Sequence, residues 1–236
     1  MNRTFKPALL VLIPLLLACS LCFGQGTWER VGASPISGLV GWWKFDEGSG
    51  TSAADSSGNG NTGTASGTTV VAGKIGNARS FNGTSDYIAV GNPASLQITG
   101  DVSMCAWAYP QGFSDFIFSK GDYGNNYDYS LYITGAGLLA LYYGSNNIVA
   151  TTSIVVWSFN VWQHLCAVVQ STNVTFYVNG VPYSASGTAT IANTNQQFDI
   201  GDSDGGWRFH GIIDELRIYN RALSAAEVWR IYNGAP

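Results

Sequence analysis

Residues 162–180 read WQHLCAVVQSTNVTFYVNG, and this stretch decides the fold class. From Trp162 to Val169 the side chains divide between two faces with a period of two, which is the periodicity of a β-strand. Ser171-Thr172-Asn173 predicts a turn. A second alternating run follows and ends at Asn179-Gly180, a pair that accommodates the positive backbone angles of a tight hairpin return. The stretch therefore predicts two consecutive β-hairpins.

The rest of the chain repeats this pattern. With 236 residues, 29 of them glycine, 13% aromatic and 11% charged residues, the composition is that of one β-rich domain with a substantial core. Strand-like runs separated by turn residues lie at Gly38–Phe45, Asp86–Val90, Val102–Tyr109, Phe113–Ser119, Tyr129–Ile133, Leu138–Tyr143, Trp162–Val169, Val174–Val178, Phe198–Gly201 and Arg208–Tyr219. Such strands predict an all-β, two-sheet antiparallel sandwich, because each sheet must bury one face.

One short C-terminal helix completes the prediction. Ser224 suits the N-cap position, and Glu227 three residues later completes a capping box. Gly234 follows the apolar run as a stop signal.

The first 24 residues have the features of an export signal. Arg3 and Lys6 precede the apolar run 7–23, which is shorter than the roughly 20 residues of a membrane span. The sequence thus predicts a signal at 1–24, a linker at 25–37 and one domain at 38–236, secreted or at the cell surface, with no transmembrane span. The signal looks bacterial. The run 16–19 ends in Cys19 and resembles a lipobox, so a lipid anchor at Cys19 is the alternative to a soluble product.

The charge of the exported chain argues against a nucleic-acid partner. Without Arg3 and Lys6 the chain has nine basic and 15 acidic residues, a net charge near −6. No basic stripe is present that could displace the counterions of phosphates.

Two cysteines remain in the domain once Cys19 and Cys22 are assigned to the signal. Cys105 and Cys166 lie in the middle of predicted strands, and an even pair in an oxidising compartment favours a disulfide. Two buried free thiols are the alternative.

Five segments together resemble the LamG-like jelly-roll modules of the concanavalin A-like lectin/glucanase superfamily. In family order they are GLVGWWKFDEGSGTSAADSSGNGNTGT from Gly38, GKIGNARSFNGTSDYIAV from Gly73, VSMCAWAYP, WQHLCAVVQSTNVTFYVNG and GIIDELRIYNRALSAAEV from Gly211. They cover nearly all of residues 38–233. The cysteine pair is also similar to the intrachain disulfide of pentraxins. The resemblance implies a jelly roll of two curved antiparallel sheets, often with bound calcium.

The sequence does not predict an enzyme. The glucanase branch of the superfamily carries a Glu-x-Asp-x-x-Glu strand, which this chain lacks. Asp214 and Glu215 are adjacent, so regular alternation would place them on opposite faces of a strand. With His164 and His210 as the two histidines, a Ser/His/Asp triad is not expected.

Calcium is the expected cofactor, because loops rich in Asp, Asn and Gly supply the oxygen ligands that it prefers. A structural ion is predicted at Asp46, Asp55, Asn61 and Asp214, where it would join the first and last strands. The alternative is that Asp55 and Asn61 bond only to the backbone of their own turns.

A second, ligand-side calcium is predicted at Asp128, Asp202 and Asp204, which align approximately with calcium-binding segments of pentraxins. Tyr127 and Trp207 lie beside these aspartates and are predicted to contact a sugar. The alternative is that Trp207 is an ordinary loop or core aromatic.

Two functions are consistent with these features. The first is a non-catalytic carbohydrate- or glycan-binding module, whose partner is a polysaccharide or glycan. The second is a structural or adhesive domain that binds a surface or matrix protein, with calcium only as a structural staple. The fold alone does not choose between them.

Overall fold

The computed structural model describes residues 37–112, 115–122, 126–143, 147–152, 155, 158–188, 191, 195–203 and 207–234. All of them belong to the unit Ala33–Pro236. The predicted export signal at 1–24, Cys19 within it, the linker up to residue 36 and Asp204 lie outside the described residues, so these predictions stay predictions.

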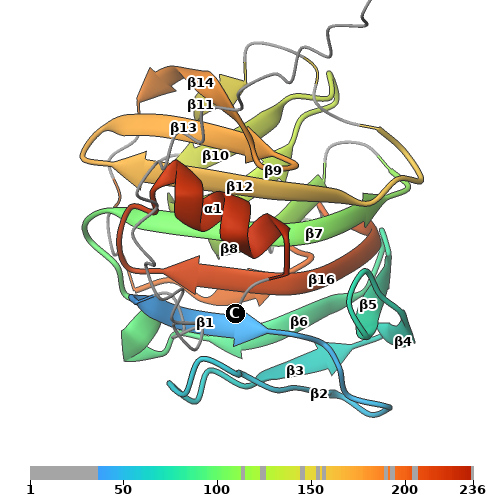
Figure 1. The fold of residues 1–236 in the computed structure, drawn as a ribbon. Helices are drawn as coiled ribbons and strands as arrows, with labels where there is room; N and C mark the ends of the chain where they lie inside the picture. Colours follow the sequence, from blue (N-terminus) through green and yellow to red (C-terminus); the bar gives the residue numbers. More distant parts are fainter. Residues whose placement is uncertain are drawn as a thin grey trace, which may run out of the picture. The chain divides into compact units, whose positions relative to one another are not determined.

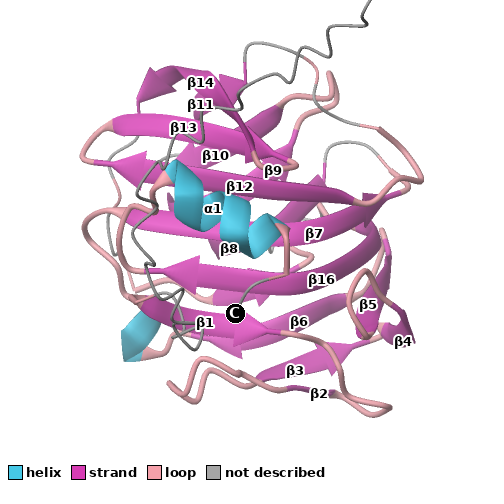
Figure 2. Ribbon diagram, in the orientation of Figure 1, coloured by secondary structure: helices cyan, strands magenta, loops and turns pink. Residues whose placement is uncertain are grey.

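Two antiparallel sheets form the domain (Figures 1 and 2). The helix-side sheet has the order β14 (Val181–Thr188), β13 (Asn173–Val178), β12 (Gln163–Gln170), β7 (Val102–Pro110), β16 (His210–Tyr219), β5 (Asn77–Asn82) and β4 (Thr69–Ala72), with β1 (Leu39–Trp43) also on β16. The far sheet has the order β2 (Ser52–Ala53), β3 (Gly63–Ser66), β6 (Tyr87–Gly91), β15 (Phe198–Ile200), β8 (Asp115–Asp122), β9 (Asn126–Ile133), β10 (Leu139–Tyr143) and β11 (Asn147–Thr152). Pairing of β11 with β14 links the two sheets.

The predicted fold class is confirmed. The structure contains an all-β, two-sheet antiparallel jelly-roll sandwich with one short C-terminal helix, α1 (Ala225–Tyr232), and a 3-10 turn at Ala94–Leu96. All ten predicted strand runs are strands, whereas β2–β5, β11 and β14 were not predicted.

The hairpin stretch shows how alternation builds the core. Leu165, Ala167 and Val169 of β12 lie in the cluster between the sheets, whereas Cys166 and Val168 face the cluster beneath α1. Asn179 and Gly180 have φ values of 51° and 78°, as the hairpin return requires. Both sides of this strand are thus buried.

The predicted disulfide is also confirmed. Cys105 of β7 lies directly opposite Cys166 of β12, and the two residues are bonded. The bridge lies beneath α1, where Val228 and Ile231 belong to the same buried cluster.

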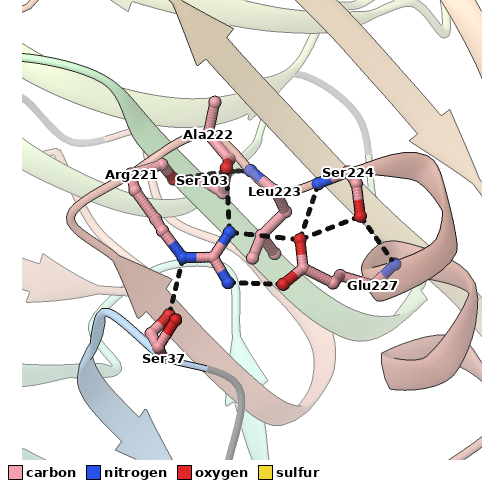
Figure 3. A network of polar contacts seen from close by, with 7 residues as sticks. All are labelled: Ser37, Ser103, Arg221, Ala222, Leu223, Ser224 and Glu227. Carbon is pink, nitrogen blue, oxygen red and sulfur yellow. Dashed lines mark hydrogen bonds and ion pairs between the residues drawn. The ribbon is translucent and has the colours of Figure 1, made fainter.

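The capping box of α1 forms as predicted and extends into a larger network (Figure 3). The backbone N–H of Ser224 donates to Glu227 Oε2 at 2.8 Å, and that of Glu227 donates to the Ser224 hydroxyl at 3.3 Å. The Arg221 guanidinium pairs with both oxygens of Glu227 and donates to the carbonyl of Ser37 at 2.8 Å. The network therefore ties the start of α1 to the segment before β1.

Replacing Glu227 by glutamine is expected to cost about 0.5–1 kcal/mol at neutral pH. The Arg221 side chain lowers the pKa of Glu227 from 4.5 to about 2. Because the folded pKa is depressed, this stabilisation is present above about pH 4.5 and is lost as the pH falls through about 2. Urea unfolding at several pH values measures it.

Ser224→Ala is the matched control, since it removes the hydroxyl cap without removing a charge and its cost should depend much less on pH. A Glu227→Gln cost that stays constant down to about pH 2 would contradict the ion-pair account.

Candidate functional site

Asp55 of the first predicted calcium set is held by its own turn and the neighbouring strand. Its Oδ1 accepts hydrogen bonds from the backbone N–H groups of Trp42 at 3.0 Å and Ser57 at 2.8 Å. Its Oδ2 accepts from the N–H of Asn61 at 2.9 Å. The Asn61 amide in turn donates to the carbonyl of Val40 at 2.6 Å. These contacts fasten the loop 55–61 to β1.

The other two members of this set lie against the loop 73–77. Asp46 is exposed, and its Oδ1 accepts from the N–H of Asn77 at 3.1 Å. Asp214 is fully buried, and its Oδ2 accepts from the N–H of Ile75 at 2.9 Å. Burial raises the pKa of Asp214 to about 7, although the hydrogen bond from Ile75 acts in the opposite direction.

The expectation that Asp214 and Glu215 occupy opposite faces is wrong. Ile213 and Leu216 both belong to the intersheet core, so the two acidic residues between them are both excluded from it. The cause is a β-bulge, where the β16–β7 register shifts and Glu215 has a φ of 52°. Glu215 Oε2 accepts from Trp42 Nε1 and pairs with Arg217, each at 2.8 Å.

Asp128 of the second predicted set forms a buried ion pair. Its Oδ2 lies 3.1 Å from Lys120 Nζ, and both side chains are fully buried. Lys120 Nζ also donates to Asn92 Oδ1 at 2.9 Å and to the carbonyl of Gln196 at 2.6 Å. The ammonium thus binds three oxygens from three separate parts of the chain, at an end of β9.

Asp202 is also bonded to protein groups. Its Oδ1 accepts from the N–H of Ser203 at 2.7 Å, and its Oδ2 lies 3.1 Å from Arg208 Nη2. Arg208 lies 5.2 Å from the ring centre of Tyr87 as well. Arg208 was not predicted from the sequence, although it directly follows Trp207.

The two predicted sugar-contacting aromatics differ in exposure. Trp207 is 43% exposed and lies beside Arg208 in the segment between β15 and β16. Tyr127 is 1% exposed and stacks on Phe116 with ring centres 5.4 Å apart, in a cluster with Tyr132. In this structure Trp207 is therefore the accessible aromatic of the pair.

Within the described ranges, no three His, Cys, Asp or Glu side chains gather closely enough to hold a metal ion. Backbone N–H groups, Lys120 and Arg208 bind several carboxylate oxygens of the two sets, whereas Asp214 Oδ1 is buried without a hydrogen-bond partner among the described residues. Calcium stays a prediction, and Asp204 lies outside the described residues.

A family model described as the concanavalin A-like lectin/glucanases superfamily matches residues 82–229. The chain belongs to this superfamily. Domain 4 of AbnA, an extracellular arabinanase from Geobacillus stearothermophilus solved with arabinotriose, is a similar superfamily structure. It is 26% identical, with a TM-score of 0.67 over 82% of this chain and 98% of that one.

Two further solved structures share the fold at lower identity, and one curated sequence is similar to part of the chain. The binding domain of Paraclostridial Mosquitocidal Protein 1 is 19% identical, with a TM-score of 0.67 over 84% of this chain and 52% of that one. Trypanosoma rangeli sialidase is 17% identical, with a TM-score of 0.65 over 84% and 33%. Among curated sequences, adhesion G-protein coupled receptor V1 of Danio rerio is 26% identical over 151 residues, 58% of this chain and 2% of that receptor.

None of the helices in the described part of the chain is long and apolar enough to cross a membrane.

Proposed function

We propose that this chain is an exported, non-catalytic module that binds a glycan. The observation that carries the proposal is the likeness to the arabinotriose-bound domain, because it spans 98% of that domain at 26% identity. A likeness confined to the sandwich core would support only the fold.

The surface around Trp207, between β15 and β16, is the proposed contact surface. An exposed indole offers an apolar face to the CH groups of a sugar ring, and nearby polar groups can bind its hydroxyls. Arg208 is held in place there by Asp202 and by the carbonyl of Thr84 at 3.4 Å. The surface beside the indole is therefore ordered before the sugar arrives, which lowers the entropic cost of binding.

The absence of catalysis is part of the proposal. Glycoside hydrolysis uses two carboxyl groups that flank the scissile bond. Glu215 is bound to Trp42 and Arg217, and Asp214 is fully buried beside it, so neither of the adjacent acids on β16 is available as a nucleophile.

Replacing Trp207 by alanine is expected to weaken glycan binding by about 2 kcal/mol, or roughly 30-fold, as for a buried tryptophan anchor. The measurement is a glycan array followed by calorimetric titration of the best neutral oligosaccharide, starting with arabinan fragments. Trp229→Ala is the matched control, because Trp229 is an exposed tryptophan, 58% accessible, on α1. Equal losses in both variants, or none, would overturn the proposed surface.

The same titration in calcium and in EDTA tests the calcium prediction. An affinity that falls in EDTA and returns with calcium would support an ion at Asp128, Asp202 and Asp204. An unchanged affinity would show that the glycan binds without it.

The second candidate function is adhesion to a surface or matrix protein. The observation that favours it is the 26% identity with the adhesion receptor from Danio rerio. This function would be supported if the chain bound no glycan on the array but still bound cells saturably after the cells were treated with glycosidases. The mass of the mature protein would also distinguish a soluble product from one with a diacylglyceryl group on Cys19.

A further inference from the structure

Two adjoining cavities are lined by residues around the C-terminal end of α1. The larger, about 520 Å³, is lined by Lys74, Ile75, Trp107, Tyr232, Asn233 and Gly234. The smaller, about 200 Å³, is lined by Trp42, Lys44, Asp46, Ile75, Glu215, Arg217 and Gly234. Because Ile75 and Gly234 border both, we treat the two as one trough, here called the indole trough. Its larger part has the volume of an ordinary small-ligand site.

Both walls of the indole trough carry a lysine over an indole. Lys74 Nζ lies 4.5 Å from the ring centre of Trp107, and Lys44 Nζ lies 4.2 Å from that of Trp42. The sequence has one further lysine after the export signal, Lys120, which is buried against Asp128. In the described part of the chain, neither Lys44 nor Lys74 forms an ion pair, so both ammonium groups can bind an external anion.

The acidic groups of the trough compensate its cations only in part. Glu215 is bound by Arg217 and Trp42 Nε1, each at 2.8 Å. Asp46 accepts from the N–H of Asn77 at 3.1 Å and keeps its negative charge. Lys44, Lys74 and Arg217 against Asp46 and Glu215 leave the lining with one positive charge in excess, on a chain whose net charge is negative.

A buried histidine side chain lies next to the trough. The ring of His164 is 5.3 Å from that of Trp107 and 5.9 Å from that of Tyr232, both of which line the larger cavity. His164 is 1% exposed, and neither of its ring nitrogens has a hydrogen-bond partner among the residues that the structure describes. Burial and the charge of Arg217 lower the pKa of His164 to about 3, so the ring is neutral at physiological pH, with one donor and one acceptor.

An unsatisfied buried polar group beside a cavity requires an explanation. Tyr232 belongs to the last turn of α1, and its ring lies between the larger cavity and His164, 5.9 Å from the imidazole. A hydroxyl group of a ligand that reached the imidazole would supply the missing hydrogen bonds.

We propose that the indole trough binds an acidic saccharide, a chain of sugar rings that bears carboxylate or sulfate groups. Lys44 and Lys74 pair with the anionic groups, and the half-buried rings of Trp42 and Tyr232 contact the apolar edges of the sugars. Trp107 is only 5% exposed and supports Lys74 and Tyr232 from below. The inference rests on the proposed glycan-binding function for its ligand class, but it concerns a different surface from that of Trp207. The aromatic rings can contact the CH groups of a sugar, and the ring nitrogens of His164 can bind a hydroxyl group. An acidic peptide would need only the lysines, so these features favour a sugar.

The test is calorimetric titration of the full chain with oligogalacturonate, a heparin-derived sulfated oligosaccharide and a neutral oligosaccharide of equal length. The variants are Lys44→Met/Lys74→Met and the charge-conserving Lys44→Arg/Lys74→Arg. We expect the wild type to bind an acidic sugar and the methionine variant to lose about tenfold per lysine, as for charge-assisted hydrogen bonds. The dependence of affinity on salt concentration should also be weaker in the methionine variant, because it has lost two charges. The arginine variant should retain most of the affinity and most of the salt dependence.

Each remaining outcome decides the matter. Equal acidic-sugar affinity in wild type and methionine variant overturns the inference, as does tighter binding of polyglutamate, which would indicate an acidic peptide. Trp229→Ala, which lies outside the lining of the trough, should leave acidic-sugar binding unchanged. If the chain binds a neutral glycan through Trp207 but binds no acidic sugar, this inference is wrong and the proposed function stands. If it binds no sugar at all, both are wrong.

Discussion

Asp128→Ala is expected to destabilise the domain by about 3–5 kcal/mol, because it leaves the ammonium of Lys120 buried without its carboxylate. Both side chains are fully buried, with Nζ and Oδ2 3.1 Å apart. Burial already lowers the pKa of Lys120, and the hydrogen bond and charge of Asp128 oppose that shift. Without Asp128 the pKa of Lys120 should fall further, so the variant's deficit should shrink as the pH rises. Urea unfolding between neutral and alkaline pH measures this.

The double variant Lys120→Met/Asp128→Ala is the decisive control. Replacement of a whole buried ion pair by apolar groups is often close to neutral, so the double variant should be more stable than Asp128→Ala alone. A double variant whose loss equals the sum of the two single losses would show that the pair is not energetically coupled.

Urea unfolding of the wild type, with and without EDTA, tests the calcium prediction at Asp128. Lys120 Nζ is bound by Asp128, Asn92 Oδ1 and the carbonyl of Gln196, which are the kinds of oxygen that calcium also prefers. If the ammonium is the resident cation, EDTA should leave the unfolding midpoint of the wild type unchanged. A midpoint that falls in EDTA would instead support an ion at Asp128.

The strands that could be predicted are those with a clear apolar face. The run Trp162–Val169 alternates strictly, and its two sides pack against two different buried clusters. The missed strands lack this signal. β3 reads GTAS, and β14 reads VPYSASGT, with Val181, Pro182, Ser184, Gly187 and Thr188 exposed, so the pairing of these strands depends on their neighbours rather than on their own hydrophobicity.

Candidate site residues were harder to place, because their roles depend on contacts between distant segments. Asp55 could be recognised as a turn residue from its Gly-rich loop, and its bonds to Ser57 and Asn61 are local. Its hydrogen bond from the N–H of Trp42 joins residues 13 positions apart, which the sequence pattern does not predict. The ion pair of Asp202 with Arg208, six residues later, was not predicted either. The bulge at Glu215 places a residue other than glycine at positive φ, which alternation cannot predict.

The indole trough shows the same limit. Lys44 lies two residues after Trp42, just past the end of β1, so their contact is local. Lys74 and Trp107 are brought together by the sheet, in which β5 lies on one side of β16 and β7 on the other. In the sequence Trp42 and Trp107 only fall within the predicted strand runs Gly38–Phe45 and Val102–Tyr109, and their contacts with the lysines follow from the assembled sheet.

Removal of the disulfide by Cys105→Ala/Cys166→Ala is expected to lower the free energy of unfolding by roughly 4 kcal/mol. The bridge closes a loop across a sequence separation of 61 residues, which restricts the unfolded chain strongly. The two strands stay paired by their backbone ladder, and both cysteines lie in a cluster with Val228 and Ile231 of α1. Small apolar replacements should therefore leave the folded arrangement intact.

The loss of stability has two candidate sources, release of the unfolded chain from the cross-link and loss of cysteine packing beneath α1. The slope of the urea unfolding curve distinguishes them. If the bridge acts through the unfolded state, the variant's unfolded chain is more expanded and the slope should rise along with the fall in midpoint. Reduced wild-type protein should match the double variant in both quantities, since it lacks the bridge but keeps the side chains. If the double variant instead loses stability with an unchanged slope, and the reduced wild type does not lose stability, the stabilisation comes from packing of the cysteines beneath α1.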